Sequence, residues 1–304
     1  MMSILTKIPR PLKNLLVYLS YFLPDKFYTQ VRFFLVFRYW PQLKTPRSFC
    51  EKINWLKLYD RNPLRAIVAD RILVRDYVRE KAPSCILPVH LWVGPQLTSD
   101  IWQSLPDKFV LKAYHGSGMI AVILQKREVT FKSVSGITRR WLQTDYSRKA
   151  REWVYHKLPK LIIAEEFIDI ESERVPMDFK FLCFNGHVEL IMVDIDRFTK
   201  HRRNLYDRKF RKMNAEHFFP SGPDIPKPDI LNHAIQIAES LAVPFDFIRV
   251  DLYISKDAVY FGEMTCFPEA GFGHFKPKSL DFLFGERLKL HTESTPLGRQ
   301  SVNE

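Results

Sequence analysis

The sequence predicts an α+β fold, in which helical segments lead into antiparallel hairpins. Asn185-Gly186 lies between two alternating apolar runs, and this dipeptide is a strong signal for a two-residue hairpin turn. A second hairpin is predicted in FDFIRVDLYISKDAVYFGEMTCF, with its turn near residues 255–257. Apolar residues at helical spacing dominate residues 46–105 before these hairpins. Helices and antiparallel strands are therefore expected within one chain.

The 304 residues suffice for one large mixed domain or for two to three subdomains that share a core. Composition and pattern change along the chain and predict five regions. They are a basic amphipathic N-terminal arm at 1–45, an N-terminal region at 46–105, a first subdomain at 106–160, a second subdomain at 161–292 and a tail at 293–304.

The elements follow in order. Helices are predicted in PRSFCEKINWLKLYD and in ADRILVRDYVREKA, and CILPVHLWV is a short buried strand. FVLKAY and MIAVILQ form a hairpin around HGSG, and residues 129–160 are basic and helical. LIIAEEFI is a strand, DFKFLCFNGHVELIMVDID is the hairpin with the Asn185-Gly186 turn, residues 218–229 are loop, and LNHAIQIAESLAV is a helix.

Composition narrows the class of protein. Hydrophobic residues make up 46% and charged residues 26% of the chain, as in soluble globular proteins. The formal net charge of +12 favours an anionic partner, such as a nucleotide, a phosphorylated lipid, an acidic polymer or an anionic membrane surface. No nucleic-acid-binding motif occurs, so we expect no nucleic-acid partner. The four cysteines form no CxxC pair, which argues against zinc and favours a reducing, cytoplasmic compartment.

The N-terminal arm is the most aromatic part of the chain. LLVYLSYFLPDKFYTQVRFFLVFRYW carries basic residues among Leu, Phe, Tyr and Trp, and Pro24 divides it into two helical stretches. No stretch reaches the roughly 18 uncharged apolar residues of a membrane span, and no small-residue site for signal cleavage is present. The arm fits an interfacial helix pair on an anionic membrane surface and equally a helix pair packed on the protein's own core.

The first motif with chemical content is VLKAYHGSGM. Lys112 ends a predicted strand, and Gly116 and Gly118 follow in a short loop. Glycines let a backbone approach a ligand and present its N–H groups to phosphate oxygens, with a lysine charge beside them. A hairpin turn beside a surface lysine would give the same pattern.

The second motif joins IRVDLY and YFGEMT. With the turn near residue 256, Asp251 and Glu263 pair across the hairpin and face the same side, together with Arg249 and Thr265. Two carboxylates at that spacing suit Mg²⁺, which takes one or two carboxylates plus phosphate oxygens. The alternative is a salt-bridge network in which Arg249 neutralises both acids.

The third motif is IIAEEFI, in which two acids interrupt an apolar strand. Such a segment can serve as a hinge whose backbone and one carboxylate meet a purine base. The alternative is a strand end with solvated acids.

Taken together and in this order, the motifs resemble the ATP-grasp superfamily, and more closely its TupA-like family of surface-polysaccharide biosynthesis. The resemblance covers about residues 47–290. It is carried by FCEKINWLKLYDRNP, ADRILVRDYV, LPDKFVLKAYHGSG, IIAEEFI, DFKFLCFNG and FDFIRVDLYISKDAVYFGEMT. It implies the ATP-grasp fold, in which two α+β subdomains hold ATP between them, with ATP and Mg²⁺ as cofactors.

The resemblance also implies roles for individual residues. Lys112 matches one of two phosphate-contacting lysines, and Arg71 stands where the other is usual, keeping the charge but not the shape. Lys180 or Lys209 would reach the γ-phosphate, and Asp178 matches a residue that holds the ribose. The nucleotide positions are completed by the phosphate-covering loop and the adenine hinge, which comprise His115, Gly116, Ser117, Gly118, Glu165, Phe167 and Ile168.

For the chemistry, Asp251 and Glu263 match the magnesium ligands, and Thr265 stands where an asparagine is usual. Arg249 resembles the arginine that steadies the tetrahedral intermediate in D-alanine ligase-type members. The resemblance thus implies a carboxylate–amine ligase that acts through an acyl phosphate.

The predicted substrates are an amine and a small-molecule or lipid-linked saccharide carboxylate, in the synthesis of a bacterial capsule, O-antigen or other surface polysaccharide. The enzyme is expected in the cytoplasm, at the inner face of the membrane if the arm binds lipid. The alternatives are a glycosyltransferase, for which VDID at 193–196 is the one DxD match, and a non-catalytic nucleotide-binding protein.

Overall fold

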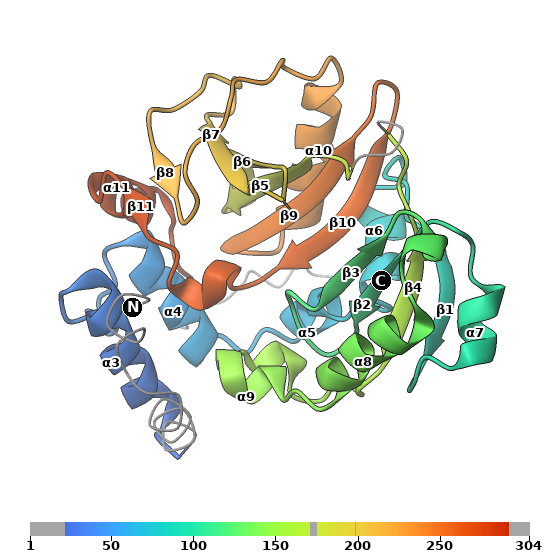
Figure 1. Cartoon of the computed structure of the whole chain (residues 1–304). Coiled ribbons are helices and arrows are strands. Elements are labelled where there is room, and N and C mark those ends of the chain that lie inside the picture. Colours follow the sequence, from blue (N-terminus) through green and yellow to red (C-terminus); the bar gives the residue numbers. More distant parts are fainter. Residues whose placement is uncertain (1–21, 171–174, 198, 292–304) are drawn as a thin grey trace, which may run out of the picture.

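The computed structural model describes residues 22–170, 175–197 and 199–291. Two antiparallel sheets face each other, with helices gathered around them (Figure 1). The helices are α3 (Asp25–Phe37), α4 (Phe49–Tyr59), α5 (Pro63–Ala69), α6 (Val74–Lys81), α7 (Ser99–Ser104), α8 (Phe131–Leu142), α9 (Tyr146–Ala150), α10 (Leu231–Ala242) and α11 (Ser279–Arg287).

The smaller sheet has the strand order β1-β4-β2-β3. Its strands are β1 (His90–Gly94), β4 (Ile162–Glu166), β2 (Phe109–Ala113) and β3 (Ile120–Ile123). A hydrophobic core of its own lies against α7 and α8 and includes Trp102, Phe109 and Leu111. The predicted hairpin around HGSG is confirmed, because β2 and β3 pair from Phe109↔Ile123 to Lys112↔Ile120.

The larger sheet has the order β10-β9-β5-β6-β7. Its strands are β10 (Val259–Thr265), β9 (Phe247–Ile254), β5 (Asp178–Phe184), β6 (His187–Ile195) and β7 (Arg202–Tyr206). Helix α10 packs on this sheet, and all seven residues of β5 are buried. The β5–β6 turn is confirmed at Asn185-Gly186, where both residues have positive φ (50° and 85°), as a type I′ turn requires.

The β9–β10 hairpin contains the feature that sets the site's geometry. The register runs regularly from Val259↔Ile254 to Phe261↔Leu252 and then shifts by one residue at Gly262, so that Glu263 pairs with Asp251. A Cβ on Gly262 would lie 2.8 Å from the carbonyl oxygen of Asp251, so this close approach requires glycine. The bulge brings the two carboxylates opposite each other, as the sequence predicted.

Helix α4 begins with a capping box, in which Ser48 and Glu51 satisfy each other's backbone N–H groups. It packs against α11 and against η3 (Pro268–Gly271), a short turn that follows β10. Helix α4 therefore supports the chain where it leaves the larger sheet.

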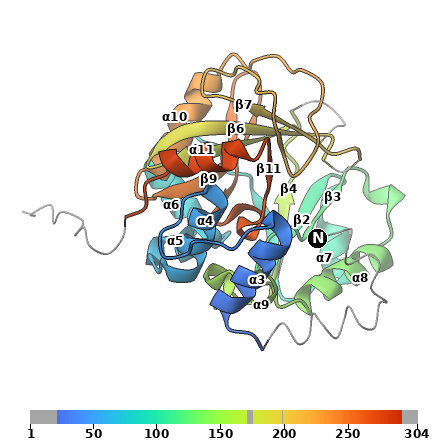
Figure 2. The ribbon, with the colours of Figure 1, turned by 90° about the vertical axis from the view of Figure 1, so that its left-hand side faces the viewer.

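The described part of the N-terminal arm packs on the core. Helix α3 starts after Pro24 as predicted, buries Phe33 and Phe37, and lies beside α9 (Figure 2). Arg151 pairs with Asp25 across this contact. The other face of α3 leaves large apolar side chains exposed, so one helix shows both features that the sequence left open. No helix within the described ranges is long and apolar enough to cross a membrane, and the part of the arm at 1–21 lies outside them.

Some predicted elements differ from the structure. ADRILVRDYVREKA is not one helix: α6 begins only at Val74, because the Asp70 carboxylate accepts hydrogen bonds from the N–H groups of Ile72 and Leu73 and turns the chain there. In CILPVHLWV the strand begins at His90, after Pro88, and is half-exposed because β1 lies at the edge of its sheet.

The predicted region boundaries also cut across the sheets. The smaller sheet combines β1 from 46–105, β2 and β3 from 106–160, and β4 from 161–292. The smaller sheet is therefore assembled from three predicted regions, because β4 pairs with both β1 and β2.

Candidate functional site

Between the two sheets lies a narrow slot with mostly apolar walls. It is lined by Val110, Ile120 and Val122 from the smaller sheet, by Tyr253 and Phe261 from the larger one, and by Phe167, Ile168, Val175 and Pro176 after β4. Three segments thus enclose a mostly apolar space that suits a planar apolar group.

Lys112 lies at the inner end of this slot. Its ammonium pairs with the carboxylate of Glu165 on β4, and the ring of His90 lies 3.4 Å from that carboxylate. Burial alone would raise the pKa of Glu165, but Lys112 and His90 outweigh it and lower the pKa to about 2. The side chain of Glu165 therefore positions Lys112, while Phe167 and Ile168 line the slot as predicted for an adenine hinge.

Residues 115–118, which we call the glycine loop, border a hollow that is also lined by Lys112 and by residues of the larger sheet. Gly118 has a φ of 74°, and a Cβ there would meet nothing within 4 Å, so its backbone borders open space. Gly116 packs against Tyr146, whose ring a Cβ would meet at 2.5 Å. Ser117 and Gly118 line the hollow beside Lys112, and His115 instead turns inward, with its Nε2 2.9 Å from the carbonyl oxygen of Trp141.

Arg71 holds the base of this loop. Its guanidinium donates to the carbonyl oxygens of Ala113 (3.2 Å) and Gly116 (3.3 Å), and it lies 3.5 Å from the carboxylate of Glu263. Arg71 therefore links the glycine loop on the smaller sheet to the acids on the larger one.

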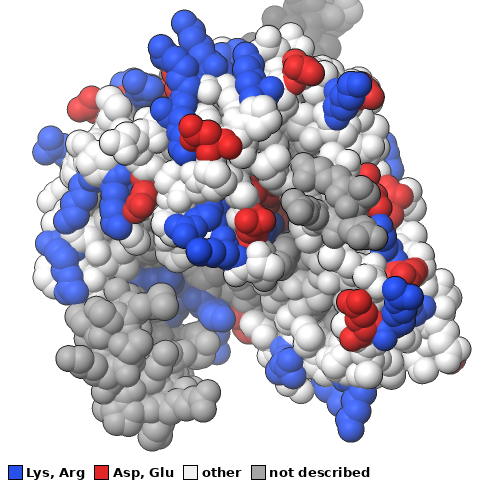
Figure 3. Space-filling view, turned by 45° about the horizontal axis from the view of Figure 1, so that its top comes forward, with Lys and Arg blue, Asp and Glu red and all other residues white. Residues whose placement is uncertain are grey.

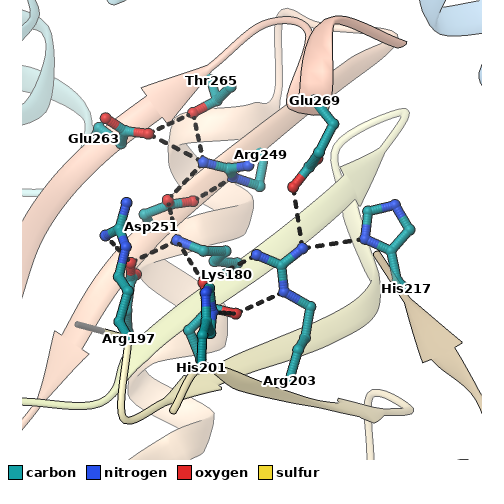
Figure 4. A network of polar contacts seen from close by, with 12 residues as sticks. Lys180, Arg197, His201, Arg203, His217, Arg249, Asp251, Glu263, Thr265 and Glu269 are labelled. Atoms are coloured by element: carbon teal, nitrogen blue, oxygen red, sulfur yellow. Dashed lines mark hydrogen bonds and ion pairs between the residues drawn. The ribbon is translucent and has the colours of Figure 1, made fainter. Parts of the chain in front are cut away.

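Four charged side chains and one hydroxyl cover the facing side of the larger sheet, and we call them the charged face: Lys180, Arg249, Asp251, Glu263 and Thr265 (Figure 4). Arg249 donates to both oxygens of Asp251 (2.7 and 2.8 Å), to Glu263 (3.0 Å) and to Thr265 (3.0 Å). Its Nη1 makes no hydrogen bond to any residue that the structure describes. The salt-bridge network that the sequence analysis gave as an alternative is thus present, and Nη1 of Arg249 remains available to donate to a ligand.

Lys180 on β5 completes the charged face. Its ammonium lies 2.7 Å from Asp251 and 2.5 Å from Asp178, and Arg197 donates to Asp178 at 2.9 Å. Burial alone would lower the pKa of Lys180, but Asp178 and Asp251 outweigh it and raise the pKa. Burial likewise opposes ionisation of Glu263, but Arg71 and Arg249 keep its pKa well below the usual range. Lys180 and Glu263 therefore stay charged at neutral pH.

Asp178 lies between the slot and the charged face and lines both hollows. Its Oδ1 is buried and has no hydrogen-bond partner among the described residues. An orphaned buried acceptor at this point suits a hydroxyl or a cation supplied by a ligand. This agrees with the ribose role that the resemblance implies.

Of the two lysines left open by the sequence, the structure brings only Lys180 to the site. Lys209 is exposed in the turn after β7, where its backbone N–H donates to Asp207 (2.9 Å), and it lines none of the hollows described above. Lys209 follows β7, which ends at Tyr206, and so lies outside the strands that carry the charged face.

The sequence analysis missed a second buried network beside the charged face. Arg203 on β7 forms a bidentate pair with Asp194 (2.6 and 2.9 Å) and donates to Glu269 (3.0 Å), and its Nη1 lies 3.2 Å from the ring of His217 (Figure 4). Burial lowers the pKa of His217 to about 4, so the ring is neutral. No motif marked these residues, because they come from β6, β7, β8 (Glu216–His217) and η3 and meet only in the folded chain.

Glu269 belongs to an unusual turn. Glu269, Ala270 and Gly271 all have left-handed backbone conformations, with φ of 47°, 54° and 79°. Two of the three are not glycine, which costs about 1–2 kcal/mol each and requires support from surrounding contacts. Helix α4 gives that support, since Lys57 donates to the carbonyl of Ala270 (2.6 Å) and Asn54 to that of Gly271 (2.7 Å).

Both networks open into one large hollow, which we call the main cleft, with a volume of about 560 Å³. Its walls carry aromatic and basic side chains together with a few acids. They include Arg32 from α3, Tyr146, Lys149 and Glu152 from α9 and the residues after it, Phe218 and Phe219 after β8, and Arg249, Glu263 and Glu269. Ser117 and Gly118 also border it, so the glycine loop connects the slot to the main cleft.

The predicted metal ligands fit Mg²⁺ by chemistry. Asp251 and Glu263 are cross-strand partners, and the Thr265 hydroxyl donates to Glu263 at 2.9 Å, which gives a set of hard oxygen atoms. The described ranges contain no group of three or more His, Cys, Asp and Glu placed to hold a metal by themselves. Two carboxylates with ligand phosphate oxygens are the arrangement that Mg²⁺ favours, so these residues suit a metal that arrives with a nucleotide.

Two α+β units with a slot, a glycine loop and an acid pair between them define a protein of the ATP-grasp class. A family model described as TupA-like ATPgrasp matches residues 51–289, which is most of the chain. The chain belongs to the TupA-like ATP-grasp family and has the ATP-grasp fold.

The comparison with curated proteins gave no match. Solved structures similar to the chain include the ATP complex of a D-alanine–D-alanine ligase from Bacillus anthracis, with 12% identity, 66% of this chain and 54% of that chain covered, and a TM-score of 0.39. An ADP complex of N5-carboxyaminoimidazole ribonucleotide synthetase has 13% identity, 72% and 51% coverage, and a TM-score of 0.40. The chain thus spans about half the length of these two structures.

Proposed function

We propose that the protein is an ATP-dependent ligase that joins a carboxylate to an amine through an acyl phosphate. The main support for this proposal is that the slot, the hollow at the charged face and the main cleft share lining residues and adjoin one another. The apolar slot leads past Lys112 and the glycine loop to the charged face, and the charged face opens into the main cleft. A nucleotide would occupy the first two spaces, and the second substrate would reach its terminal phosphate from the third.

In this arrangement the adenine lies in the slot beside Phe167 and Ile168, and the ribose lies near Asp178. Lys112, Arg71 and the N–H groups around Gly118 face the phosphates, and Lys180 lies beside the γ-phosphate. Asp251, Glu263 and Thr265 would hold Mg²⁺, which spreads negative charge on the transferred phosphoryl group when bound.

The reaction then proceeds in two displacements. A carboxylate oxygen attacks the γ-phosphorus, and the bond to the leaving ADP breaks, giving an acyl phosphate. The amine nitrogen attacks the acyl carbon, the new C–N bond forms, and phosphate leaves with the C–O bonding electrons. Arg249 has its Nη1 left over to stabilise the oxyanion, while its other nitrogens hold it in place on Asp251 and Glu263.

We further propose that the carboxylate belongs to a saccharide, free or lipid-linked, of a bacterial surface polysaccharide. Supporting this, the main cleft is wide and carries aromatic side chains, Phe218 and Phe219, beside basic ones. Aromatic faces suit sugar rings, and basic groups suit an acidic saccharide.

The alternatives lack comparable support. In VDID, the single DxD match, Asp194 is buried and saturated by Arg203, so it does not suit the metal of a glycosyltransferase. For nucleic acid, the face in Figure 3 shows Lys and Arg interspersed with Asp and Glu instead of a continuous basic stripe.

The function can be tested by incubating the protein with ATP, Mg²⁺ and a panel of uronates and amines. We expect release of ADP and phosphate that depends on both substrates, with a product whose mass equals their sum minus water. Turnover of a nucleotide sugar without ATP would instead establish the glycosyltransferase alternative.

We also propose that the arm places the enzyme at the cytoplasmic face of a membrane with anionic lipid. The outer face of α3 and the residues after it expose Phe27 (48%), Phe34 (43%) and Trp40 (47%) beside Lys26 and Arg38. Large apolar side chains with basic neighbours suit an interfacial helix.

The membrane proposal predicts that the protein sediments with vesicles of phosphatidylglycerol and phosphatidylethanolamine, less so as salt rises. Phe27→Asp with Phe34→Asp should abolish this without a loss of melting temperature, since both side chains are exposed. Phe33→Asp is the matched control, because Phe33 is buried and its change should unfold the protein. Equal sedimentation of the double variant and the unsubstituted protein would contradict the proposal.

A further inference from the structure

One carboxylate of the main cleft has no hydrogen-bond or ion-pair partner among the residues that the structure describes. Glu152 follows α9 and is 3% exposed, yet its side chain makes no ion pair or hydrogen bond with any residue in the described ranges. A buried glutamate is almost always paired, so an unpaired one at the wall of a substrate cleft needs an explanation. The other acids of this cleft are engaged, Asp194 and Glu269 with Arg203 and Glu263 with Arg249.

The backbone holds Glu152 in place. Arg151 before it has a left-handed conformation, with a φ of 60°, and the N–H of Glu152 donates to the carbonyl of Ser147 at 3.1 Å. Its own carbonyl accepts from Tyr155 in η2 (Trp153–Tyr155) at 3.3 Å. Glu152 lines the main cleft together with Arg249 and Thr265.

The surroundings of Glu152 bring its pKa close to neutral, so that both the carboxylic acid and the proton-accepting carboxylate are populated near pH 8. Burial raises its pKa to about 8, since nearby cations only partly offset the cost of burying its charge. The charged and titratable groups that act on it from the elements around it are Arg32 (α3), Lys57 (α4), Tyr146 (α9), Tyr155 (η2), Arg249 (β9), Glu263 (β10) and Cys266.

The proposed ligation requires such a group. An aliphatic amine enters as an ammonium ion, which has no lone pair and cannot attack an acyl phosphate. A carboxylate at the cleft wall attracts the ammonium and can accept its proton, and acceptance is most efficient for a base whose pKa lies near the working pH. Lys180 and Arg249 cannot serve, because neighbouring acids raise the pKa of each and keep both as cations.

We infer that Glu152 is the catalytic base that receives the ammonium group of the amine substrate and removes its proton. One N–H bond breaks and the proton moves to a Glu152 oxygen. The freed lone pair then forms the C–N bond as phosphate leaves the acyl carbon. This inference rests on the proposed ligase function and adds the site and protonation state of its amine substrate.

The test compares two nucleophiles with Glu152→Gln. With ATP, Mg²⁺ and glucuronate as the carboxylate probe, hydroxylamine is largely unprotonated at neutral pH and needs no base, whereas ethanolamine is an ammonium ion. The variant should keep near-normal hydroxamate formation and lose amide formation from ethanolamine by about 10²-fold or more, as for loss of a general base. Glu128→Gln, an exposed glutamate in the same part of the chain, should change neither.

The outcomes separate the two proposals. Equal loss of hydroxamate and amide in Glu152→Gln would assign Glu152 a structural role, and unchanged amide formation would exclude it as the base. If the unsubstituted protein released no carboxylate-dependent ADP with glucuronate or the other uronates, the ligase function itself would fail and this inference with it.

Discussion

The two sheets that enclose the site differ in how deeply their strands are buried. Every residue of β5 in the larger sheet is buried, whereas only the last of the four residues of β3 in the smaller sheet is. The larger sheet belongs to a hydrophobic core shared with α4, α10 and α11, while the smaller one has a separate core against α7 and α8.

This difference in burial corresponds to the functional residues on each sheet. The charged face stands largely on the buried strands β5 and β9, so that its four ionisable side chains keep fixed positions. Lys112 and the glycine loop stand on half-exposed strands, which open at lower free energy than a buried core. We therefore expect the larger sheet to be the rigid frame and the smaller sheet to be the part that moves over a nucleotide.

The largest expected effect comes from removing a charge of the rigid frame. Arg249→Ala leaves Asp251 with only Lys180 as its partner in a buried site, which should lower the free energy of unfolding by about 3–5 kcal/mol. It should also reduce turnover by about 10²–10³-fold through the lost oxyanion donor. Denaturant unfolding and ADP release measure the two effects.

Arg249→Lys is the matched variant, since it keeps the charge but loses the fork that spans Asp251 and Glu263. It should recover part of the stability and little of the rate. A stable Arg249→Ala protein would show that the larger sheet does not depend on its charges, and would weaken the comparison.

A smaller change in the free energy of unfolding is expected as the pH is lowered. His217 beside β7 has a pKa of about 4, lowered from 6.5 by burial, so the unfolded chain binds a proton that the folded chain does not between these values. Stability is therefore complete above pH 6.5 and falls by roughly 3 kcal/mol as pH drops to 4. His217→Gln should flatten this slope in urea unfolding, whereas a change of the exposed His156 should not. Parallel slopes for both variants would argue against a buried neutral His217.

The smallest stability change belongs to the smaller sheet. Lys112→Ala should cost about 1–3 kcal/mol, because Glu165 retains His90 nearby. It should weaken binding of a non-hydrolysable ATP analogue by about 10- to 100-fold in calorimetry. A loss of stability as large as that of Arg249→Ala would show that both sheets use their charges alike.

The sequence predicted the parts of this site that lie on continuous strands. Asp251 and Glu263 were predictable because period-two alternation and one turn near residue 256 relate them. Asn185-Gly186 was predictable because its turn requires positive φ at both positions. The shift at Gly262 that completes the pairing was not identified, since a glycine in a strand does not by itself show on which side the extra residue lies.

Other features depend on contacts that no local pattern encodes. The pairing of β4 with β1 and β2 arises when distant segments meet, and so does the Arg203–Asp194–His217–Glu269 network. Which of Lys180 and Lys209 lies at the site could likewise be decided only from the folded chain, in which Lys180 lines the main cleft and Lys209 does not. Sequence reasoning alone kept the salt-bridge and metal interpretations of the acid pair apart, whereas the structure shows salt bridges on the same carboxylates that we propose hold Mg²⁺.

The left-handed turn at residues 269–271 has a consequence for how the gene can vary. Cys50, Asn54 and Lys57 project from one side of α4 and bond to the carbonyl oxygens of Gly273, Gly271 and Ala270. A saturation library should therefore find FCEKINWLK intolerant of substitution although these three side chains reach backbone rather than nucleotide. In a screen, variants of this helix would lose activity because the cleft wall is displaced. A second-site suppressor is expected at Ala270, because glycine adopts the same backbone conformation there without penalty.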